Sequence, residues 1–290
     1  MAEYIELKHI QKLVPKRNDL MNKGSFGRIL NIAGSKLYSG AAFLSSVSPL
    51  KTGAGYVSLA CPQEIIDRIA PNAPELTFIP LKSNSNGSIS TDNKIEDIEK
   101  YDVISLGCGL TTDIETQRFV FSLIKQFNDR QKVIIDADGI NILAERKSDI
   151  SLKNKIITPH PKELSRLLNV SPIEINDNRE KYARITAQTY DCIVVLKGHN
   201  TIITNGDKIY LNTTGSSALA KAGTGDVLTG IISGLLSQKL SLFNAAIFGV
   251  YLHGLAGDIA AERLTKYSVL ASDVIDNIPN ALKKIIGDFN

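Results

Sequence analysis

The sequence from 221 to 228 reads Lys221-Ala222-Gly223-Thr224-Gly225-Asp226-Val227-Leu228, a glycine-rich turn that leads directly into a helical pattern. Glycine lacks a Cβ atom, so the turn can bring backbone N–H groups close to an anion, and the partly positive start of a helix stabilises negative charge there. Asp226 can cap the first helical turn. Beside a phosphate, however, its charge is unfavourable unless it removes a proton from an attacking hydroxyl. The stretch predicts an anion hole next to a general base, with an ordinary capped helix as the alternative.

The segments on either side of this turn differ in pattern. Downstream, apolar residues recur with helical spacing to the end of the chain. Upstream, short β-branched runs alternate with longer helical patterns, as in parallel strands joined by crossover helices. We expect strands at residues 28–33, 56–60, 76–79, 103–106, 133–136, 155–158 and 193–196. These patterns predict an α/β fold in one three-layer α/β/α domain over residues 1–290, with a mainly parallel central sheet.

Two connecting segments have their own signals. Asn205-Gly206-Asp207 separates the β-branched runs 201–204 and 208–211. Asn-Gly supplies the positive φ values of a tight turn, so we expect a hairpin there. The stretch 82–93 is rich in Ser, Asn and Gly and predicts an exposed loop.

Composition limits the class of protein. A chain of 290 residues that is 43% apolar can bury a large core. The net charge of +3 comes from 33 basic and 30 acidic residues spread along the chain, so we expect neither a nucleic-acid nor a membrane partner. Cys61, Cys108 and Cys192 are odd in number and lack metal-ligand spacing, which favours a reducing compartment. The N-terminus does not resemble a signal peptide, and the apolar run 242–257 is too short for a bilayer. A soluble, cytoplasmic protein is expected.

Ligands of an open parallel sheet bind at the carboxyl ends of its strands, so the residues after each strand are the candidates for a site. The small-residue turn 34–42 and the turn Gly107-Cys108-Gly109-Leu110 can each bring the backbone close to a ligand, although Ser39 could simply cap a helix. The stretch 136–141 gathers two carboxylates and an amide, which suit an Mg²⁺ water shell or ligand hydroxyls. The alternative there is that Asp138 caps the next helix.

Two later strand ends carry further titratable side chains. His160 lies between two prolines, which disfavours a buried regular element and favours contact with a ligand. Glu163 either orders a metal hydration shell or favours the helix dipole. Lys197 follows an apolar run and can neutralise phosphate charge. The chain has neither a P-loop sequence nor a third glycine after Gly225 at the Rossmann spacing, so those two nucleotide sites are not predicted.

Taken together, these motifs resemble those of the ADP- or ATP-dependent NAD(P)H-hydrate dehydratase family. The resemblance is collinear from about residue 24 to residue 261 and rests on the motifs at 38–42, 52–55, 136–141, 158–161, 197–198 and 223–228. It implies a ribokinase-like fold and the repair of NADHX and NADPHX, hydrated forms of the reduced nicotinamide dinucleotides. ADP or ATP, with Mg²⁺, would phosphorylate the ring hydroxyl of the S-epimer. The phosphate would then leave by elimination to restore NADH or NADPH.

The same resemblance implies a role for each candidate residue. Asp226 would deprotonate the hydroxyl, and the backbone of Gly223, Thr224, Gly225 and Asp226 would form the anion hole. The nucleotide would be held by Lys197, Gly198, His199, Asn200, Thr201 and Gly225. The hydrated dinucleotide would be contacted by Ala41, Gly109, His160 and Asp226. Glu163 would serve the metal, directly or through water. Members of the family often form homotetramers, so a homotetramer is also implied.

The chain departs from the family pattern at two positions and leaves two other functions open. Cys108 stands where the family commonly has proline, and Lys162 replaces a frequent glycine; both changes affect loop geometry. We expect no fused epimerase domain, because the resemblance occupies most of these 290 residues. A kinase of a small alcohol, such as hydroxymethylpyrimidine or hydroxyethylthiazole, would use the same anion hole and base but keep the phosphate on its product. A nucleotide-binding regulatory protein would bind nucleotide without turnover.

Overall fold

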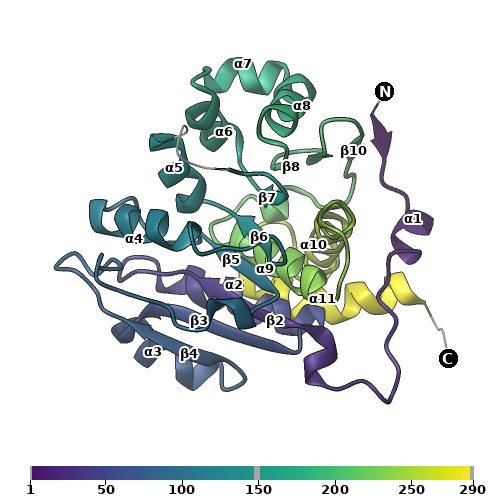
Figure 1. Ribbon diagram of the computed structural model, residues 1–290. Helices are drawn as coiled ribbons and strands as arrows, with labels where there is room; N and C mark the ends of the chain where they lie inside the picture. The colour runs from purple at the N-terminus through teal and green to yellow at the C-terminus, as the bar shows by residue number, and fades with distance from the viewer. Residues whose placement is uncertain (1, 147–150, 288–290) are drawn as a thin grey trace.

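Ten strands form a single sheet in the computed structural model, which describes residues 2–146 and 151–287 (Figure 1). The strands are β1 Glu3–Tyr4, β2 Arg28–Ile32, β3 Tyr56–Pro62, β4 Thr77–Leu81, β5 Val103–Leu106, β6 Lys132–Ile135, β7 Lys155–Ile157, β8 Ile193–Leu196, β9 Ile202–Thr204 and β10 Ile209–Leu211. Their order across the sheet is β1-β10-β9-β8-β7-β6-β5-β2-β3-β4. Strand β9 is antiparallel to both of its neighbours, and the other neighbouring pairs are parallel. The prediction of a mainly parallel sheet is confirmed.

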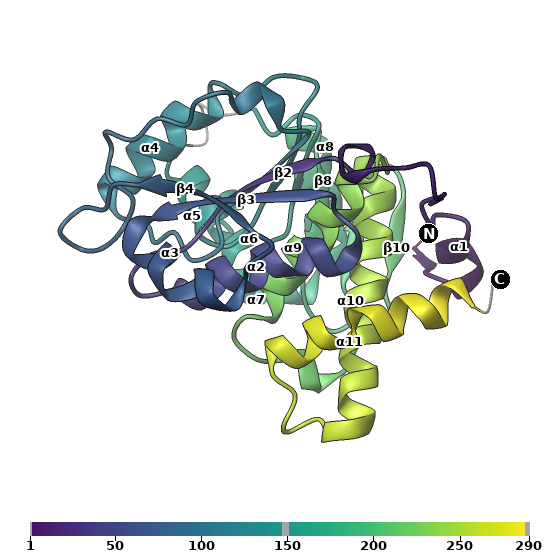
Figure 2. The same cartoon turned by 90° about the horizontal axis from the view of Figure 1, so that it is seen from below.

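Helices cover both faces of this sheet (Figure 2). They are α1 Leu7–Gln11, α2 Ser39–Thr52, α3 Gln63–Ile69, α4 Ile114–Ile124, α5 Asp138–Glu145, α6 Pro161–Leu168, α7 Pro172–Asp177, α8 Arg179–Tyr190, α9 Thr224–Ser237, α10 Leu242–Leu264 and α11 Ala271–Ile286. One apolar core joins the sheet to α2, α9, α10 and α11, and a second joins it to α4 through α8. The three-layer α/β/α architecture is therefore confirmed.

The central strands show why the sheet carries a helical layer on each face. Successive side chains of a strand point to opposite faces. In β6, Ile134 belongs to the core with α9 and α10, whereas Val133 and Ile135 belong to the core with α4 and α5. In β5, Val103 and Ile104 divide in the same way. A strand buried on both faces must be apolar throughout, and that is the pattern of these runs.

Small residues let α9 approach α2 closely. A Cβ atom added to Gly230 would lie 2.6 Å from the Cβ of Ser48, and one added to Gly234 would lie 2.9 Å from the carbonyl oxygen of Pro49. Larger side chains at either position would force the helices apart. This contact sets the axis of α9, and with it the place of the glycine-rich turn at its start.

Helix α10 corrects one expectation about the apolar run 242–257. The helix continues to Leu264 and has 23 residues, so it is long and apolar enough to cross a membrane, and the prediction that the run is too short was wrong. In its most apolar window, however, 67% of the residues are buried inside the protein. The apolar composition of α10 follows from its packing between the sheet and the helices α9 and α11.

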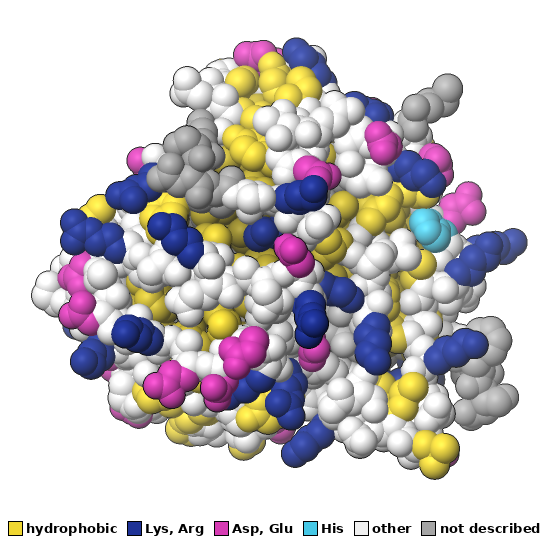
Figure 3. Space-filling view, viewed as in Figure 1, with side chains coloured by type: hydrophobic (Ala, Val, Ile, Leu, Met, Phe, Trp, Pro, Cys, Tyr) yellow, Lys and Arg dark blue, Asp and Glu magenta, His cyan; other side chains and the backbone are white. Residues whose placement is uncertain are grey.

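On the face of the protein shown in Figure 3, Lys and Arg side chains are interspersed with Asp and Glu side chains.

The connecting segments agree with the sequence in part. The predicted hairpin is confirmed as β9 and β10, with Gly206 at φ +94° in the turn. The stretch 82–93 is a loop with exposed residues at 82, 85, 86 and 92, but residues 87–89 are buried, so the prediction of an exposed loop is confirmed only in part. Asn84 and Asn86 donate hydrogen bonds to the Asp113 carboxylate at the start of α4, which holds the loop against the domain.

The strand boundaries differ most at the two edges of the sheet. The run predicted at 76–79 is shifted to Thr77–Leu81, and β1 was not predicted. Strand β1 has two residues, and it exists because Glu3 and Tyr4 pair with β10. Beside it, α1 reaches the end of α11, where the Gln11 side chain donates to the carbonyl of Ile285 at 3.0 Å.

Candidate active site

Four neighbouring strand ends form the site. Strands β5, β6, β7 and β8 are adjacent and parallel, so the segments that follow them meet at one edge of the sheet. The start of α9 reaches the same edge, where a Cβ atom added to Gly225 would lie 3.6 Å from Lys197 Nζ and 3.9 Å from Asp136 Oδ2. The structure thus brings together residues that the sequence singled out at separate strand ends.

A buried ion pair lies at the centre. Lys197 Nζ is 2.6 Å from Asp136 Oδ1 and 3.7 Å from Glu163 Oε2, and the Asp136 side chain is 1% exposed. Thr229 Oγ1 donates to the other oxygen of Asp136 at 2.8 Å. Burial alone would lower the pKa of Lys197, but Asp136 and Glu163 raise it above its ordinary value, so the ammonium stays charged. Asp136 is thus held by protein groups on both of its oxygens, and the role of the stretch 136–141 toward a metal's water shell or ligand hydroxyls stays a prediction.

Asp226 lies beside this pair. Gly223, at φ +90°, is the N-cap of α9, and within the described chain no side chain caps that helix, so the alternative that Asp226 is a cap was wrong. The Asp226 carboxylate instead lies with Cys108 and Asp136, whose polar atoms are all within 4.8 Å of one another. Burial and the nearby Asp136 raise the pKa of Asp226 to about 6. A carboxylate with that pKa is a stronger base than an exposed aspartate and is still ionised at neutral pH.

Two other capping alternatives are also wrong. Tyr38, not Ser39, is the N-cap of α2, and α2 too has no capping side chain among the described residues. Ala137, not Asp138, is the N-cap of α5. Asp138 Oδ2 accepts the backbone N–H of Thr111 at 2.8 Å, so Asp138 ties the segment after β5 to the start of α5.

Ala41 and Gly109 are brought into contact. Gly109 has φ +64°, and a Cβ atom added to it would lie 2.8 Å from the Cβ of Ala41 and 2.7 Å from the Cβ of Tyr38. Only glycine fits such a close approach with a left-handed backbone. The segment after β5 therefore lies directly on the uncapped start of α2.

His160 lies on the other side of the ion pair. The backbone N–H of Lys197 donates to the carbonyl of Pro159 at 2.8 Å, which places His160 next to the lysine. The His160 side chain is 45% exposed, and its Nδ1 accepts the backbone N–H of Glu163 at 3.1 Å. Burial and the charge of Lys197 lower the pKa of His160, so the ring is neutral at pH 7. His160 is thus the N-cap of α6 and still presents part of its ring to solvent.

The acidic groups do not form a closed cage for Mg²⁺. Cys108 contributes a thiol, which hard cations avoid, and Asp136 is already paired with Lys197. Glu163 Oε2 accepts the His160 backbone N–H at 2.7 Å, and burial raises the pKa of Glu163 to about 7 although Lys197 opposes that shift. This donor set fits an ion held mainly by water and by the phosphates of a nucleotide.

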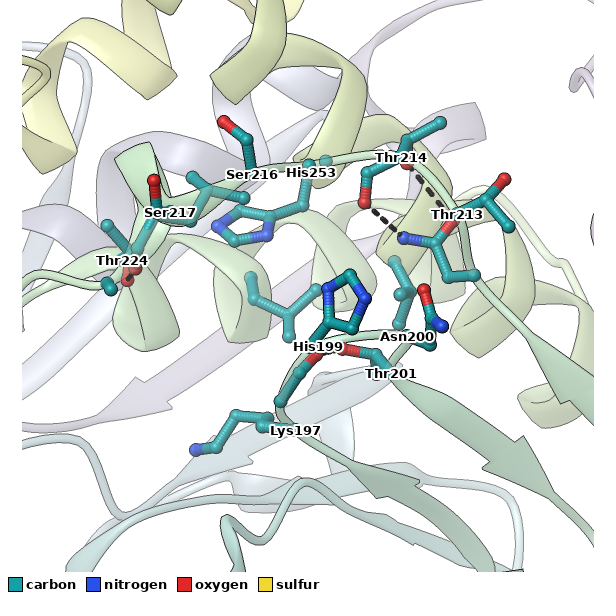
Figure 4. A pocket seen from close by; sticks show the side chains of 18 of the residues that line it. Lys197, His199, Asn200, Thr201, Thr213, Thr214, Ser216, Ser217, Thr224 and His253 are labelled. Carbon is teal, nitrogen blue, oxygen red and sulfur yellow. Dashed lines mark hydrogen bonds between the residues drawn. The ribbon is translucent and has the colours of Figure 1, made fainter. Parts of the chain in front are cut away.

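A pocket with a volume of about 380 Å³ opens beside Lys197 (Figure 4). All six residues predicted to hold a nucleotide line it: Lys197, Gly198, His199, Asn200, Thr201 and Gly225. Thr224, predicted for the anion hole, lines the pocket as well. The rest of its wall was not predicted and comprises Asn212, Thr213, Thr214, Gly215, Ser216, Ser217, Leu219, Ala220, Leu228, Val250, His253 and Gly254. The small polar run from 212 to 217, between the hairpin and α9, was an available signal for part of this wall.

The chain matches known proteins over nearly its whole length. Residues 29–280 match the family model described as NAD(P)H-hydrate dehydratase. The "ADP-dependent (S)-NAD(P)H-hydrate dehydratase" of Listeria monocytogenes is 31% identical over 93% of this chain and 92% of its own length. The "Bifunctional NAD(P)H-hydrate repair enzyme Nnr" of Moorella thermoacetica is 35% identical over 94% of this chain, which spans about half of that relative, 52% of its length.

A solved structure agrees with these matches. The ADP/ATP-dependent NAD(P)H-hydrate dehydratase from Bacillus subtilis, co-crystallised with ATP and Mg²⁺, superposes with a TM-score of 0.86 at 30% identity and covers 98% of this chain and 99% of that one. This agreement confirms the expected ribokinase-like fold class. The match to the family model covers most of the chain, and this protein belongs to the NAD(P)H-hydrate dehydratase family.

Proposed function

We propose that this protein dehydrates the S-epimers of NADHX and NADPHX to NADH and NADPH, with ADP or ATP as the phosphoryl donor. The position of Asp226 carries the proposal. On one side its neighbour Gly225 lines the nucleotide pocket. On the other side Asp226 lies against Cys108, and the next residue, Gly109, packs on Ala41. A base between a donor pocket and an acceptor surface is the arrangement that phosphoryl transfer to a hydroxyl needs.

The residues divide the reaction between them. The N–H groups of Gly223 to Asp226 and the Lys197 ammonium would stabilise the transferred phosphoryl group. Ala41, Gly109 and His160 would hold the hydrated ring. Asp226 would take the proton of the ring hydroxyl while the hydroxyl oxygen forms a bond to the terminal phosphorus of the donor. The bond between that phosphorus and the leaving group would break, releasing ADP from ATP or AMP from ADP. The phosphate would then leave the ring by elimination. Mg²⁺ bound with the nucleotide would neutralise phosphate charge, with Glu163 ordering its water shell.

The test combines the purified protein, NADHX, Mg²⁺ and either ADP or ATP. We expect the near-ultraviolet absorbance of reduced nicotinamide to rise only when a nucleotide is present, with one phosphate released for each NADH formed. The two initial rates give the nucleotide preference, and the same assay with NADPHX gives the dinucleotide preference. Nucleotide consumption that left phosphate on a small alcohol, with NADHX unchanged, would contradict the proposal in favour of a kinase.

We also propose that the protein works as a cytoplasmic homotetramer. The family resemblance supports the assembly, and the free, buried thiols of Cys61, Cys108 and Cys192 are in keeping with a reducing compartment. Sedimentation velocity of the purified protein measures the assembly directly.

The two glycines of the anion hole should respond differently to alanine. A Cβ atom at Gly225 meets only ordinary contacts, so Gly225→Ala is expected to fold with its stability kept or raised by ~0.5 kcal/mol. That methyl group enters the pocket beside Lys197, and we expect the KM for ADP to rise at least about tenfold. Gly223→Ala places a Cβ atom 2.6 Å from Leu44 Cδ1 at φ +90° and should lower the free energy of unfolding by ~1–3 kcal/mol. Thermal melts and ADP titrations of both variants check this contrast; equal KM values for Gly225→Ala and wild type would refute it.

The raised pKa of Asp226 predicts an acid limit to activity. The proposed base works only when ionised, and its pKa of about 6 means that kcat/KM should be level at neutral pH and fall as the pH drops below about 6. Glu163, with a pKa of about 7, is the other group that could produce such a limb. We expect the limb to keep its position in Glu163→Gln. If the fall of kcat/KM at acid pH disappeared in Glu163→Gln, the titrating group would be Glu163 and not Asp226.

A further inference from the structure

His253 is a buried histidine in the wall of the nucleotide pocket, and the reaction proposed above does not use it. It lies on α10, is 8% exposed, and lines the pocket together with Val250 and Gly254. Figure 4 shows its ring projecting toward the side of the pocket that carries Ser217 and Thr224. Nε2 of the ring is buried and has no hydrogen-bond partner among the atoms of residues 2–146 and 151–287.

A polar atom in that position is costly unless something binds it. Burying a hydrogen-bonding group without a partner destabilises a protein, and most buried polar groups have partners. Leucine or methionine would fill the same space without that cost. The ring is also uncharged, because burial lowers the pKa of His253 to about 4; the nearby backbone of Thr224 opposes that shift, and the charge of Lys197 adds to it. The ring therefore offers a neutral hydrogen bond and no attraction for an anion.

The rest of the site already provides for the phosphates. The N-terminus of α9 and Lys197 carry the positive charge and the N–H groups that a phosphate chain needs. A neutral ring suits the uncharged part of the donor. We infer that His253 recognises the nucleoside of ADP or ATP through a hydrogen bond to its sugar or base, and is a specificity-determining residue of the pocket. The inference rests on the proposed function only in that the pocket takes ADP or ATP.

Two variants of similar size isolate the hydrogen bond. His253→Met removes the polar atoms, and His253→Gln keeps an amide that can donate and accept. Binding is measured by calorimetry without NADHX, using ADP and inorganic pyrophosphate as probes. We expect the Kd for ADP to rise about fivefold to tenfold in His253→Met and less than about threefold in His253→Gln. The Kd for pyrophosphate should change less than about twofold in either variant, since pyrophosphate has no nucleoside.

Further probes locate the bond within the nucleoside. If the sugar makes the hydrogen bond, wild type should bind 2′-deoxyADP as weakly as His253→Met binds ADP. His253→Met should then bind ADP and 2′-deoxyADP with equal affinity. If the base carries it, the same comparison should hold for inosine diphosphate. The matched control is His9→Met, which removes a histidine on α1 whose ring centroid is 5.3 Å from that of Tyr210, with the two rings tilted by 50°. We expect its Kd for ADP to equal that of wild type.

The outcomes separate this inference from the proposed function. An ADP affinity for His253→Met within about twofold of wild type, or equal weakening of ADP and pyrophosphate, would overturn the inference. Should His253→Met fail to fold, weakening of ADP binding in the folded His253→Gln by as much as tenfold would overturn it too. A wild-type protein that binds ADP but leaves NADHX unchanged would refute the proposed function while the binding comparison still stands.

Discussion

Asp226→Asn is expected to lower kcat for NADHX dehydration by about 10²–10⁴-fold while the affinity for ADP stays nearly unchanged. Asparagine has almost the same shape but cannot accept the hydroxyl proton, and the N–H groups at the start of α9 are untouched. Stopped-assay rates and ADP calorimetry of the same preparation measure the two effects. The matched control is Asp92→Asn, an exposed aspartate in the loop 82–93, for which we expect the wild-type kcat. A variant at 226 with wild-type turnover would remove Asp226 from the mechanism.

The same substitution, Asp226→Asn, should raise the stability of the folded protein although it lowers kcat. The pKa of Asp226 is raised from 3.8 to about 6 in the folded protein, mainly by burial, so the folded state disfavours the ionised carboxylate. The stabilising effect of the bound proton is complete below the unfolded pKa and is lost as the pH rises through about 6. Asparagine carries no charge at any pH. We therefore expect the melting temperature of Asp226→Asn to exceed that of wild type near pH 8, and the difference to shrink toward pH 4. The variant would then be more stable because it lacks the catalytic base.

The sequence is most informative where local chemistry alone determines the structure. The runs 103–106 and 193–196 match β5 and β8 residue for residue, because a strand buried on both faces must be apolar throughout. That the residues near Lys197 would line one pocket was predictable for a related reason. In a parallel sheet, the segment after each strand lies at the ligand edge, so a glycine and a cation at that point indicate a site before the strand order is known.

The sequence is least informative where distant segments meet. The ion pair between Asp136 and Lys197 joins residues 61 positions apart, and neither residue indicates the other without the strand order. The far wall of the pocket combines residues 212–217 with residues of α10. From the sequence alone, His253 would be assigned to the core, because it is a lone histidine in an apolar helix. A weak signal was present, since Val250, His253, Gly254 and Gly257 share one helical face. Glycines on that face allow the segment 214–219 to pack against α10 and place His253 in the pocket.

Lys197→Met is expected to lower the free energy of unfolding by ~3–5 kcal/mol, because it leaves the buried Asp136 carboxylate without its counter-charge. Turnover should fall as well, since the phosphoryl group loses its cation. Lys153→Met is the matched control, because that lysine pairs with Asp191 at 3.7 Å on the surface, where both side chains are about two-thirds exposed or more, at 67% and 71%. We expect it to cost less than ~1 kcal/mol. Urea unfolding of both variants gives the comparison.

The double variant Lys197→Met/Asp136→Asn separates the two roles of the lysine. The asparagine that replaces Asp136 is uncharged and can still accept the Thr229 hydroxyl, which now donates to Asp136 at 2.8 Å, so most of the lost stability should return. Activity should not return, because the cation beside the nucleotide pocket is still missing. If the two single substitutions instead lowered stability additively in the double variant, the ion pair would not be coupled, and Lys197 would act on the nucleotide alone. Recovery of stability without turnover would show that this one ammonium both neutralises the buried aspartate and serves the donor phosphate.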